Sequence, residues 1–411
     1  MKEFAGNKIQ SLHEKSHSKR RILILIEDGS FLFDSRVRRE ASTLTKASYQ
    51  VYVICPRYPG ESKYDVHEKV HIYRYSKWKF CGHLGEYCSS LIKGFWLTCR
   101  VWKKHGFDCI QACNPPDLWF LVAAVFKLLF DIKFVFDHHD VCPELYLSRF
   151  GGNKNSLGYR LMLLLERLTF KLADGVISTN ESYKKIAMIR GGVSEKYIRV
   201  VRNGPDLNKF RLLPPDPRIK SRGRFIVGYL GNMNPQDGVE HLLLAAKKIV
   251  YNMKRKDFYF IFIGKGDSFE DLIAKKTAWG LDDYIWFTGR IPDDEMLRYL
   301  SSCDICVQPD PKNPINDIST MNKVMEYMAL GKPVVAYDLL ETHYTCGDCA
   351  LYAEPNRIED LAEKIVTLAD NEEMRLEMGK KGRERVEKFL AWKYSEPHLI
   401  DLYNVIFNKK N

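Results

Sequence analysis

Alternation of short apolar runs with amphipathic segments is the feature that most constrains the fold of this 411-residue chain. Residues 21–26 (RILILI) form a continuous branched run typical of a central parallel strand. An amphipathic segment follows at 34–46, and a second apolar run follows at 50–56. Strand, helix and strand in this order define a βαβ unit, whose crossover is nearly always right-handed. The pattern therefore predicts an open, doubly wound parallel sheet.

The same alternation then occurs in two series. Further strands of the first series are predicted at 107–112, 133–137, 175–178 and 198–201, which gives a sheet of about six strands. Strands of the second series are predicted at 225–230, 258–263, 285–288, 305–308 and 334–337. Between the series, residues 203–224 are rich in Pro, Asp and Arg and have no period, as expected of a linker.

These boundaries predict two Rossmann-like domains. The first covers 1–205, with 1–20 a candidate for disorder, and a linker covers 206–224. The second domain covers 225–389, and residues 390–411 form a C-terminal helix. The apolar, aromatic character of that helix leaves two options open: it packs back on the first domain, or on the second.

Basic charge is concentrated in the first half of the chain. Residues 1–200 contain 32 Lys and Arg against 20 Asp and Glu, whereas the remainder contains 31 against 32. This asymmetry indicates a negatively charged partner. Residues 71–104 mix aromatic with basic side chains, either as a solvated face beside an ordinary core or as a surface for peripheral contact with an anionic membrane. Nucleic acid is not expected, because no reader motif is present.

The chain is expected to be cytoplasmic, with association with the inner membrane face as an option. No apolar stretch reaches the roughly 18 residues that a membrane helix requires, and the short run at 22–26 ends in acidic residues, unlike a signal peptide. Eleven cysteines without framework spacing agree with a reducing compartment. Cys303/Cys306 and Cys346/Cys349 have C-x-x-C spacing, but SSCDICVQP is typical of a helix end entering a buried strand, which would turn Cys303 and Cys306 to different environments. No metal site is predicted.

One carboxylate stands out in the segment ISTMNKVMEYMALGKP, residues 318–333. Glu326 is the only acidic residue between Ile318 and Asp338, within an otherwise apolar helical pattern, so it is a candidate ligand-binding group. Ser319, Thr320 and Asn322 are residue types that cap a helix start, where free amides attract an anion. Lys323 adds a positive charge in the same turn.

Several motifs in the second half resemble those of the GT-B glycosyltransferases, specifically family 4. They are GRIPDDEM, KVMEYMALGKPVV and LYAEP, and they follow ADGVISTNESYKK and VRNGPDLNKF of the first half. DSRVRRE and FDHHDVCPELY look like a branch of bacterial surface-polysaccharide transferases. The resemblance implies a GT-B fold with two Rossmann-like domains facing a central cleft. It also implies a retaining, metal-independent hexosyltransferase that uses a nucleotide-diphosphate sugar, needs no cofactor, and acts on a saccharide or lipid-diphosphate-linked acceptor.

The resemblance also assigns roles in donor binding. Glu326 would hold the ribose hydroxyls, and Lys323 with the amides of the helix start would neutralise the diphosphate as it leaves. The donor-binding candidates are Gly29, Gly231, Asn232, Arg290, Ser319, Thr320, Met321, Asn322, Lys323 and Glu326. Arg290 is equally explained as a solvated arginine.

In the first domain, the resemblance places His139 near the reacting carbon of the sugar. There it can hydrogen-bond the sugar and stabilise developing positive charge, and front-face attack requires no protein nucleophile. Asp140 and Glu144 position the acceptor or orient His139; alternatively they cap the next helix. Arg38 is a further acceptor-binding candidate. The predicted catalytic residues are thus His139, Glu326 and Lys323.

The sequence departs from the family pattern at two places. Ile318 occupies the position of the first carboxylate of the Glu-x7-Glu pair, with Asp317 one residue earlier. Asn232, Gln236 and Asp237 stand in the turn where family members commonly carry an arginine and a lysine. The diphosphate cation would then be Lys323 or, as the alternative, Arg36, Arg38 or Arg39. A degenerate, scaffold-like transferase and a nucleotide-sugar 2-epimerase of the same fold are the rival hypotheses.

Overall fold

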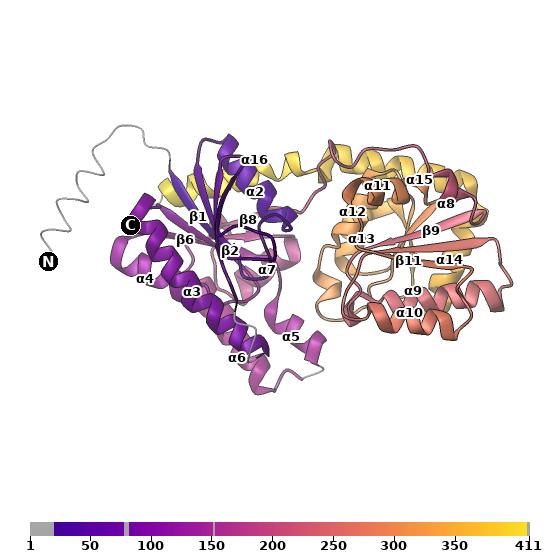
Figure 1. The fold of residues 1–411 in the computed structure, drawn as a ribbon, viewed down its shortest axis with the longest axis horizontal. Helices are drawn as coiled ribbons and strands as arrows, with labels where there is room; N and C mark the ends of the chain where they lie inside the picture. Colours follow the sequence, from indigo (N-terminus) through magenta and orange to yellow (C-terminus); the bar gives the residue numbers. More distant parts are fainter. Residues whose placement is uncertain (1–19, 78–81, 151–152, 409–411) are drawn as a thin grey trace, which may run out of the picture. The chain divides into compact units, whose positions relative to one another are not determined.

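The computed structural model describes residues 20–77, 82–150 and 153–408 (Figure 1). The disorder predicted for the first twenty residues concerns a segment that lies, except for Arg20, outside the described residues. The chain forms two α/β sheets, one from each predicted series. The predicted doubly wound fold is therefore confirmed.

The first sheet has eight strands in the order β3-β4-β2-β1-β5-β6-β7-β8. Its strands are β1 Arg21–Leu25, β2 Gln50–Pro56, β3 Tyr64–His67, β4 Val70–Tyr75, β5 Cys109–Cys113, β6 Lys133–His138, β7 Gly175–Ser178 and β8 Ile198–Val200. The helices that alternate with these strands along the chain are α2 Ser35–Lys46, α3 Gly82–His105, α4 Phe120–Phe130, α5 Cys142–Phe150, α6 Leu157–Leu172 and α7 Glu181–Ile189, and the last helix of the described chain is α16 Glu396–Asn408. The central strand β1 pairs in parallel with both β2 and β5.

The predicted count of about six strands is wrong, because β3 and β4 form an antiparallel hairpin at one edge of the sheet. The two-residue turn of this hairpin is Glu68-Lys69, and both residues have positive φ (48° and 70°). Such turns normally carry Asn or Gly, so the sequence holds no turn signal here. The exposed β3, YDVH, also lacks the apolar run that marks a buried strand.

The second sheet has six parallel strands in the order β11-β10-β9-β12-β13-β14. Its strands are β9 Phe225–Leu230, β10 Phe258–Ile263, β11 Ile285–Gly289, β12 Ile305–Gln308, β13 Val334–Tyr337 and β14 Ala350–Ala353. Its helices are α8 Pro217–Lys220, α9 Val239–Lys247, α10 Phe269–Ala278, α11 Asp293–Ser302, α12 Asn322–Ala329, α13 Leu340–Cys346, α14 Ile358–Asp370 and α15 Glu372–Arg385. The predicted linker contains α8, which Asp216 caps and Pro217 begins.

Both faces of the second sheet are buried. Along β10, Phe258, Phe260 and Phe262 belong to one core, whereas the intervening residues belong to the other. Residues of α9, α10 and α14 complete the first core, and residues of α11 and α12 complete the second (Figure 1). The strands β10 and β11, which follow β9 along the chain, lie on one side of β9 in the sheet. The next strand, β12, pairs with the other side of β9. The strand order therefore reverses between β9 and β12, which creates the crevice where open α/β sheets bind ligands.

The first C-x-x-C pair lies in the elements that the sequence predicts, with Cys303 ending α11 and Cys306 inside β12. The predicted separation of their environments is wrong, because both sulfur atoms lie beside Gly228 in one core. This happens because α11 covers the face of the sheet toward which Cys306 points.

Residue contacts divide the chain into two compact units. The first consists of Met1–His139, Arg167–Ile177 and Ile400–Asn411; the second consists of Asp140–Glu166 and Ser178–Leu399. Within the first unit, α16 packs on β7, since a Cβ at Gly175 would meet Ile406 and Leu402 at 2.8 and 3.0 Å. The predicted domain boundaries at 205 and 224 stay predictions.

Candidate functional site

Two glycine turns meet where β9 and β10 end. Gly231 has φ +155° and Gly264 has φ +132°, and a Cβ on Gly264 would run into the carbonyl oxygen of Gly231. A Cβ on Gly266 would likewise meet the backbone of Met233, at 2.6 Å. Only glycine fits such an approach of two chain segments. The turns therefore present backbone, without side chains, at the carboxyl ends of these strands.

The loop after β9 also packs on the loop after β12. Gly238 has φ +64°, and a Cβ there would run into the carbonyl oxygen of Pro309. Asn316 donates from Nδ2 to the carbonyl oxygens of Gln236 and Pro311, at 2.9 Å each. The two loops that flank the switch point are thus fixed to each other, which gives the crevice a defined wall.

Lys323 lies at this crevice with a buried partner. Its Nζ is 2.8 and 2.9 Å from the two carboxylate oxygens of Asp310, whose side chain is 1% exposed. The ammonium also lies 5.0 Å from the ring centroid of Tyr229. Asp310 is held further by Gln308, which donates from Nε2 at 2.9 Å. The predicted cation is therefore present at the crevice, but its charge is matched by a carboxylate that sequence reasoning missed.

Asp237 is the second carboxylate near Lys323. Burial raises the pKa of Asp237 to about 6, an effect that Lys323 opposes and Asp310 reinforces. Its Oδ2 accepts a hydrogen bond from the backbone N of Asn234 at 2.9 Å, which closes a capping box. The pKa of Asp237 therefore lies above the usual aspartate range, in the same turn as Asn232 and Gln236.

The start of α12 differs from the prediction. The N-cap is Met321, and no side chain caps the helix. Ser319 donates instead to the carbonyl oxygen of Ile315 at 2.7 Å, and Thr320 accepts from Asn180 Nδ2 at 3.1 Å. Ser319 and Thr320 thus act in the preceding loop, and the predicted capping role is wrong for them and for Asn322, the first helical residue. The uncapped amides still agree with an anion site at this end.

Of the remaining donor candidates, Glu326, Asn232 and Arg290 belong to the second sheet with its helices and loops, whereas Gly29 follows β1 of the first sheet. Glu326 lies half-buried on α12 between the buried Met325 and Tyr327, and Asn232 is exposed directly after Gly231. Arg290 is exposed directly after the edge strand β11. Asp317 accepts from the backbone N of Leu340 at 3.0 Å, so it supports the start of α13. Whether Asp317 takes the place of the carboxylate missing at position 318 stays a prediction.

A buried polar network lies at the carboxyl ends of β5 and β6 in the first unit. Arg36 Nη2 donates to Asp137 Oδ1 at 2.9 Å, and Arg36 Nε lies 3.1 Å from Glu40 Oε1. Gln111 Nε2 donates to Glu40 at 2.6 Å and to Asp137 at 3.2 Å. His139 Nε2 lies 2.7 Å from Asp137 Oδ2. Arg36 is therefore paired with two buried carboxyl groups, and its alternative role as the diphosphate cation stays a prediction.

The charged groups of this network change one another's pKa values. Burial raises the pKa of Glu40 to about 8, and the negative charge of Asp137 adds to this effect. Burial would also raise the pKa of Asp137, but Arg36 and His139 outweigh it and hold the pKa below the usual range. Burial, the largest effect, lowers the pKa of His139, but the charge and the hydrogen bond of Asp137, together with Asp34, raise it, so that the pKa lies above the usual value. Glu40, Cys113, Asp137 and His139 have ligand atoms within 4.8 Å of one another, but Arg36 already supplies the cation that balances them.

The other first-domain candidates lie as follows. Asp140 and Glu144 belong to the second unit, where Glu144 pairs with Arg190 at 2.7 Å, and Arg190 also holds the buried Glu166. Glu144 is thus part of an ion-pair network in the first turn of α5, and its contact with an acceptor stays a prediction.

Arg38 lies half-buried on α2. A Cβ at Gly29 would meet nothing within 4 Å, so open space lies beside that turn.

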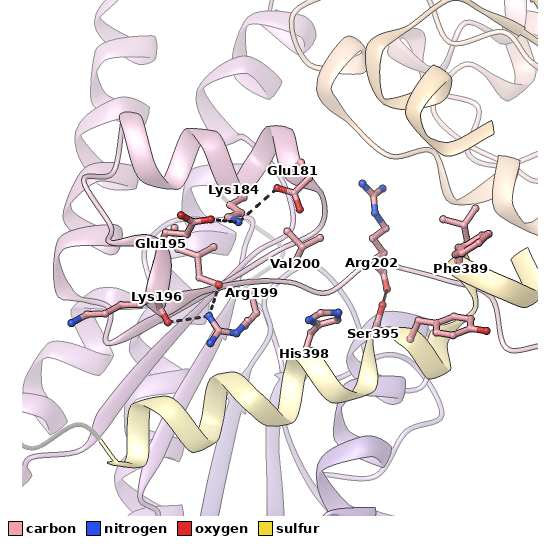
Figure 2. A pocket seen from close by; sticks show the side chains of 13 residues that line it. Glu181, Lys184, Glu195, Lys196, Arg199, Val200, Arg202, Phe389, Ser395 and His398 are labelled. Carbon is pink, nitrogen blue, oxygen red and sulfur yellow. Dashed lines mark hydrogen bonds and ion pairs between the residues drawn. The ribbon is translucent and has the colours of Figure 1, made fainter. Parts of the chain in front are cut away.

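A hollow of about 620 Å³ lies elsewhere in the second unit, between the α7 to β8 region and residues 389–398 (Figure 2). It contains none of the predicted site residues. Its main charges pair with one another, since Lys184 lies 2.8 Å from Glu195 and 3.8 Å from Glu181. Arg199 donates to the backbone carbonyls of Lys196 and Ile198. The lining carries four cationic side chains, Lys184, Lys196, Arg199 and Arg202, against the carboxylates of Glu181 and Glu195, and Arg202 also lies 3.6 Å from Glu341 outside the hollow.

The fold and the glycine-lined crevice define the chain as an α/β protein of the GT-B class. In such proteins the ligand binds at the point where the strand order reverses, here between β9 and β12. The family described as Glycosyltransferase Family 4 matches residues 35–209, and that described as Glycosyl transferases group 1 matches residues 224–371. The chain belongs to the GT-B glycosyltransferases of family 4 type.

Named relatives agree with this assignment. The N,N'-diacetylbacillosaminyl-diphospho-undecaprenol alpha-1,3-N-acetylgalactosaminyltransferase of Campylobacter jejuni is 24% identical, over 88% of this chain and 91% of its own. Sucrose-phosphate synthase from Thermosynechococcus elongatus has the same fold, with a TM-score of 0.79, 18% identity, and 95% and 99% of the two chains covered. HepE from Anabaena in complex with UDP-glucose gives a TM-score of 0.70 at 17% identity, covering 94% and 99%. Across the described residues, none of the helices has the length and apolar content that membrane crossing requires.

Proposed function

We propose that the protein transfers a glycosyl group from a nucleotide-diphosphate sugar to a saccharide acceptor, with retention of configuration, in the assembly of a cell-surface polysaccharide. The observation that carries this proposal is the crevice between β9 and β12, where the Gly231 and Gly264 turns, Lys323 and the uncapped start of α12 converge. Backbone amides together with one cation suit a diphosphate leaving group. The UDP-glucose complex of HepE, a protein of the same fold, supports this class of donor.

In this proposal each donor-site residue has a defined role. Glu326 accepts hydrogen bonds from the ribose hydroxyls, and the amides of Met321 and Asn322 with Lys323 hold the diphosphate. Gly231 and Asn232 contribute backbone at the phosphates, while Arg290 lies on the side of the base. His139 is the proposed hydrogen-bond partner of the sugar.

Nucleotide binding and sugar transfer provide the direct test. UDP, GDP and dTDP are first screened by thermal shift, since a ligand that binds only the folded state raises the melting temperature. A matching panel of nucleotide sugars is then assayed for hydrolysis and transfer. Binding of one nucleotide with turnover of its sugar supports the proposal. Binding without any turnover would support the degenerate scaffold, which the missing carboxylate at position 318 favours.

Retention and metal independence are tested on the same reaction. The anomeric configuration of the product is read by proton NMR, and inversion would contradict the proposal. Lys323 and the helix amides supply the positive charge at the leaving group, so we expect full activity after treatment with EDTA. A loss of activity that added Mg²⁺ or Mn²⁺ restores would assign that charge to a metal instead.

A lipid-diphosphate-linked acceptor fits the one-sided basic charge of the chain. The name of the Campylobacter jejuni relative gives that enzyme a diphospho-undecaprenol acceptor. Transfer to a saccharide on undecaprenyl diphosphate, compared with the same saccharide without lipid, tests this step. A cytoplasmic location at the inner membrane face follows from such an acceptor.

Exposed apolar side chains in the first unit offer a surface for that membrane. Trp96 and Ile92 on α3 are 70% and 48% exposed, and Leu128 and Leu129 on α4 are 80% and 68% exposed. Lys93, Arg100, Lys103 and Lys104 belong to the same α3. Apolar and basic groups together suit an anionic headgroup region. The protein should float with anionic vesicles at low salt, and L128S/L129S should reduce flotation. The exposed Leu340→Ser serves as control, and equal flotation of all three would contradict this surface.

A further inference from the structure

We propose that Asp137 is a positioning residue that fixes the His139 ring through Nε2 and leaves Nδ1 as the nitrogen offered to the sugar. This inference rests on the proposed transferase function. Asp137 Oδ2 lies 2.7 Å from His139 Nε2, and the backbone N of His139 donates to Asn114 Oδ1 at 2.6 Å. Ring and main chain are therefore both held at the carboxyl end of β6. The His139 side chain is 16% exposed, and within the described part of the chain its Nδ1 has no partner.

Asp137 is itself fixed by three groups. Arg36 binds its Oδ1, Gln111 binds its Oδ2, and the thiol of Cys113 lies 3.6 Å from Oδ2. The carboxylate is fully buried and cannot rotate without breaking these contacts. A buried carboxylate with such partners stays ionised and accepts from an N–H. It therefore selects the ring form that carries a proton on Nε2.

The charged groups around His139 act in opposite directions. Asp137 from β6 raises the pKa of the imidazole, and Asp34 at the start of α2 adds to this effect. Arg36 on α2 lowers the pKa, as burial does. Glu40, also on α2, titrates near pH 8 and is therefore largely neutral at pH 7. The ring consequently keeps its second proton to a higher pH than an ordinary histidine.

This arrangement gives the ring a defined task. Once protonated, His139 can donate a hydrogen bond from Nδ1 to a sugar hydroxyl while Nε2 remains on Asp137. Without the carboxylate, the ring could rotate or place its proton on the wrong nitrogen. Asp137 thus acts through His139 and has no contact with the substrate of its own.

Titration of His139 tests the coupling without any enzyme assay. The full chain is labelled with 15N-histidine, and the His139 ring signals are assigned with His139→Gln. In Asp137→Asn we expect the His139 pKa to fall by at least one unit and the Nε2–H form to lose its dominance. Glu40→Gln is the matched control, because it replaces a largely neutral neighbour in the same network, and it should leave the pKa within a few tenths. An unchanged pKa and tautomer in a folded Asp137→Asn would overturn the proposal.

Kinetics then show whether the coupling serves the reaction. Asp137→Asn should lower kcat at least tenfold with little change in the KM for the donor. His139→Gln should lower kcat to a similar extent, and the double variant should lose little more, because Asp137 acts through His139. Losses that multiply in the double variant would contradict this role. Should Asp137→Asn unfold, Arg36→Gln takes its place, with the opposite expectation that the His139 pKa rises.

Two kinds of failure remain distinguishable. If the wild-type protein transfers no sugar but the Asp137→Asn shift is observed, the proposed function fails and the positioning contact stands. If transfer is observed but His139→Gln keeps full kcat, the function stands and the role of Asp137 in it fails.

Discussion

At the scale of single residues, the pair Lys323 and Asp310 controls how much positive charge the donor site offers. The buried carboxylate holds the ammonium at 2.8 Å, so a diphosphate must share Lys323 with Asp310. We predict that Asp310→Asn raises the affinity for the cognate nucleotide diphosphate by about tenfold, or ~1.4 kcal/mol, because it frees the charge of Lys323. Isothermal titration calorimetry measures this change.

The opposite substitution should weaken binding. Lys323→Ala removes the cation and leaves Asp310 buried without its partner, which also costs about 3 to 5 kcal/mol of folding stability. The double variant Lys323→Ala/Asp310→Asn restores much of the stability but should stay at least tenfold weaker in binding than wild type. Wild-type affinity in the double variant would show that Lys323 does not contact the diphosphate.

Glu40 makes folding stability depend on pH. Burial raises its pKa in the folded state to about 8, above the value of 4.5 that is normal for glutamate. A raised folded-state pKa means that the native state binds the extra proton, so this stability is complete below about pH 4.5 and is lost as pH rises through 8. Urea unfolding from pH 5 to 9 should show this decline in the wild type. Glu40→Gln should flatten it, whereas the exposed Glu363→Gln should not.

The ion network around Asp137 could have been found in the sequence in part. Arg36 and Glu40 are four residues apart, and together with Val37, Ala41 and Leu44 they form the buried face of α2. That spacing on an apolar face indicates a buried pair, yet the basic run RVRRE suggests a solvated surface. Asp310 and Asp137 were not identifiable as partners, because their contacts depend on loops that only the folded chain brings together.

At the scale of elements, the buried parallel strands were predictable except for β4 and β14, whereas the edge strand β3 and the loops were not. RILILI and FYFIFI are continuous apolar runs, and both became buried parallel strands. The β3-β4 hairpin escaped prediction because Glu68 and Lys69 adopt positive φ without the usual Asn or Gly. The start of α12 escaped because Ser319 and Thr320 bond within the unit in ways that no local pattern encodes.

We expect the addition of one methyl group at Gly238, between the loop after β9 and the loop after β12, to lower the folding stability. Gly238→Ala places a Cβ against the carbonyl oxygen of Pro309, in addition to the strain of φ +64°. Gly192→Ala is the matched control, because Gly192 has φ +68° and open space around it. We expect Gly192→Ala to cost about 1 kcal/mol of stability and Gly238→Ala at least ~2 kcal/mol more. Denaturant unfolding measures both, and equal losses would mean that the loops adjust freely.

At the scale of the whole molecule, the two units differ in how the chain assembles them. The second unit contains its entire parallel sheet in one continuous stretch. The first unit needs α16, whose Leu402, Tyr403 and Ile406 are fully buried. Tyr403 also donates its hydroxyl hydrogen to Gln111 Oε1, a residue of the network that holds Asp137.

Loss of the contacts that α16 makes should lower the folding stability of the first unit. Tyr403→Phe should reduce stability by about 1 kcal/mol, and Ile406→Ala by about 2 to 5 kcal/mol through the cavity that it leaves. Limited proteolysis should then cut the first unit faster, with the cleavage sites mapped by mass spectrometry. Faster cleavage confined to the second unit would contradict this assignment of α16.

The position of α16 also has a consequence for the order of events during synthesis. A ribosome makes the strands of the first sheet early, but the residues that bury Gly175 and pair with Gln111 are made only after the whole second unit. Domains normally fold as they emerge, from the N-terminus onward. In this chain the second unit can reach its native state first. Until α16 has been made, the apolar surface of the first unit that α16 covers stays exposed. That interval is when the nascent protein has the greatest need of chaperones.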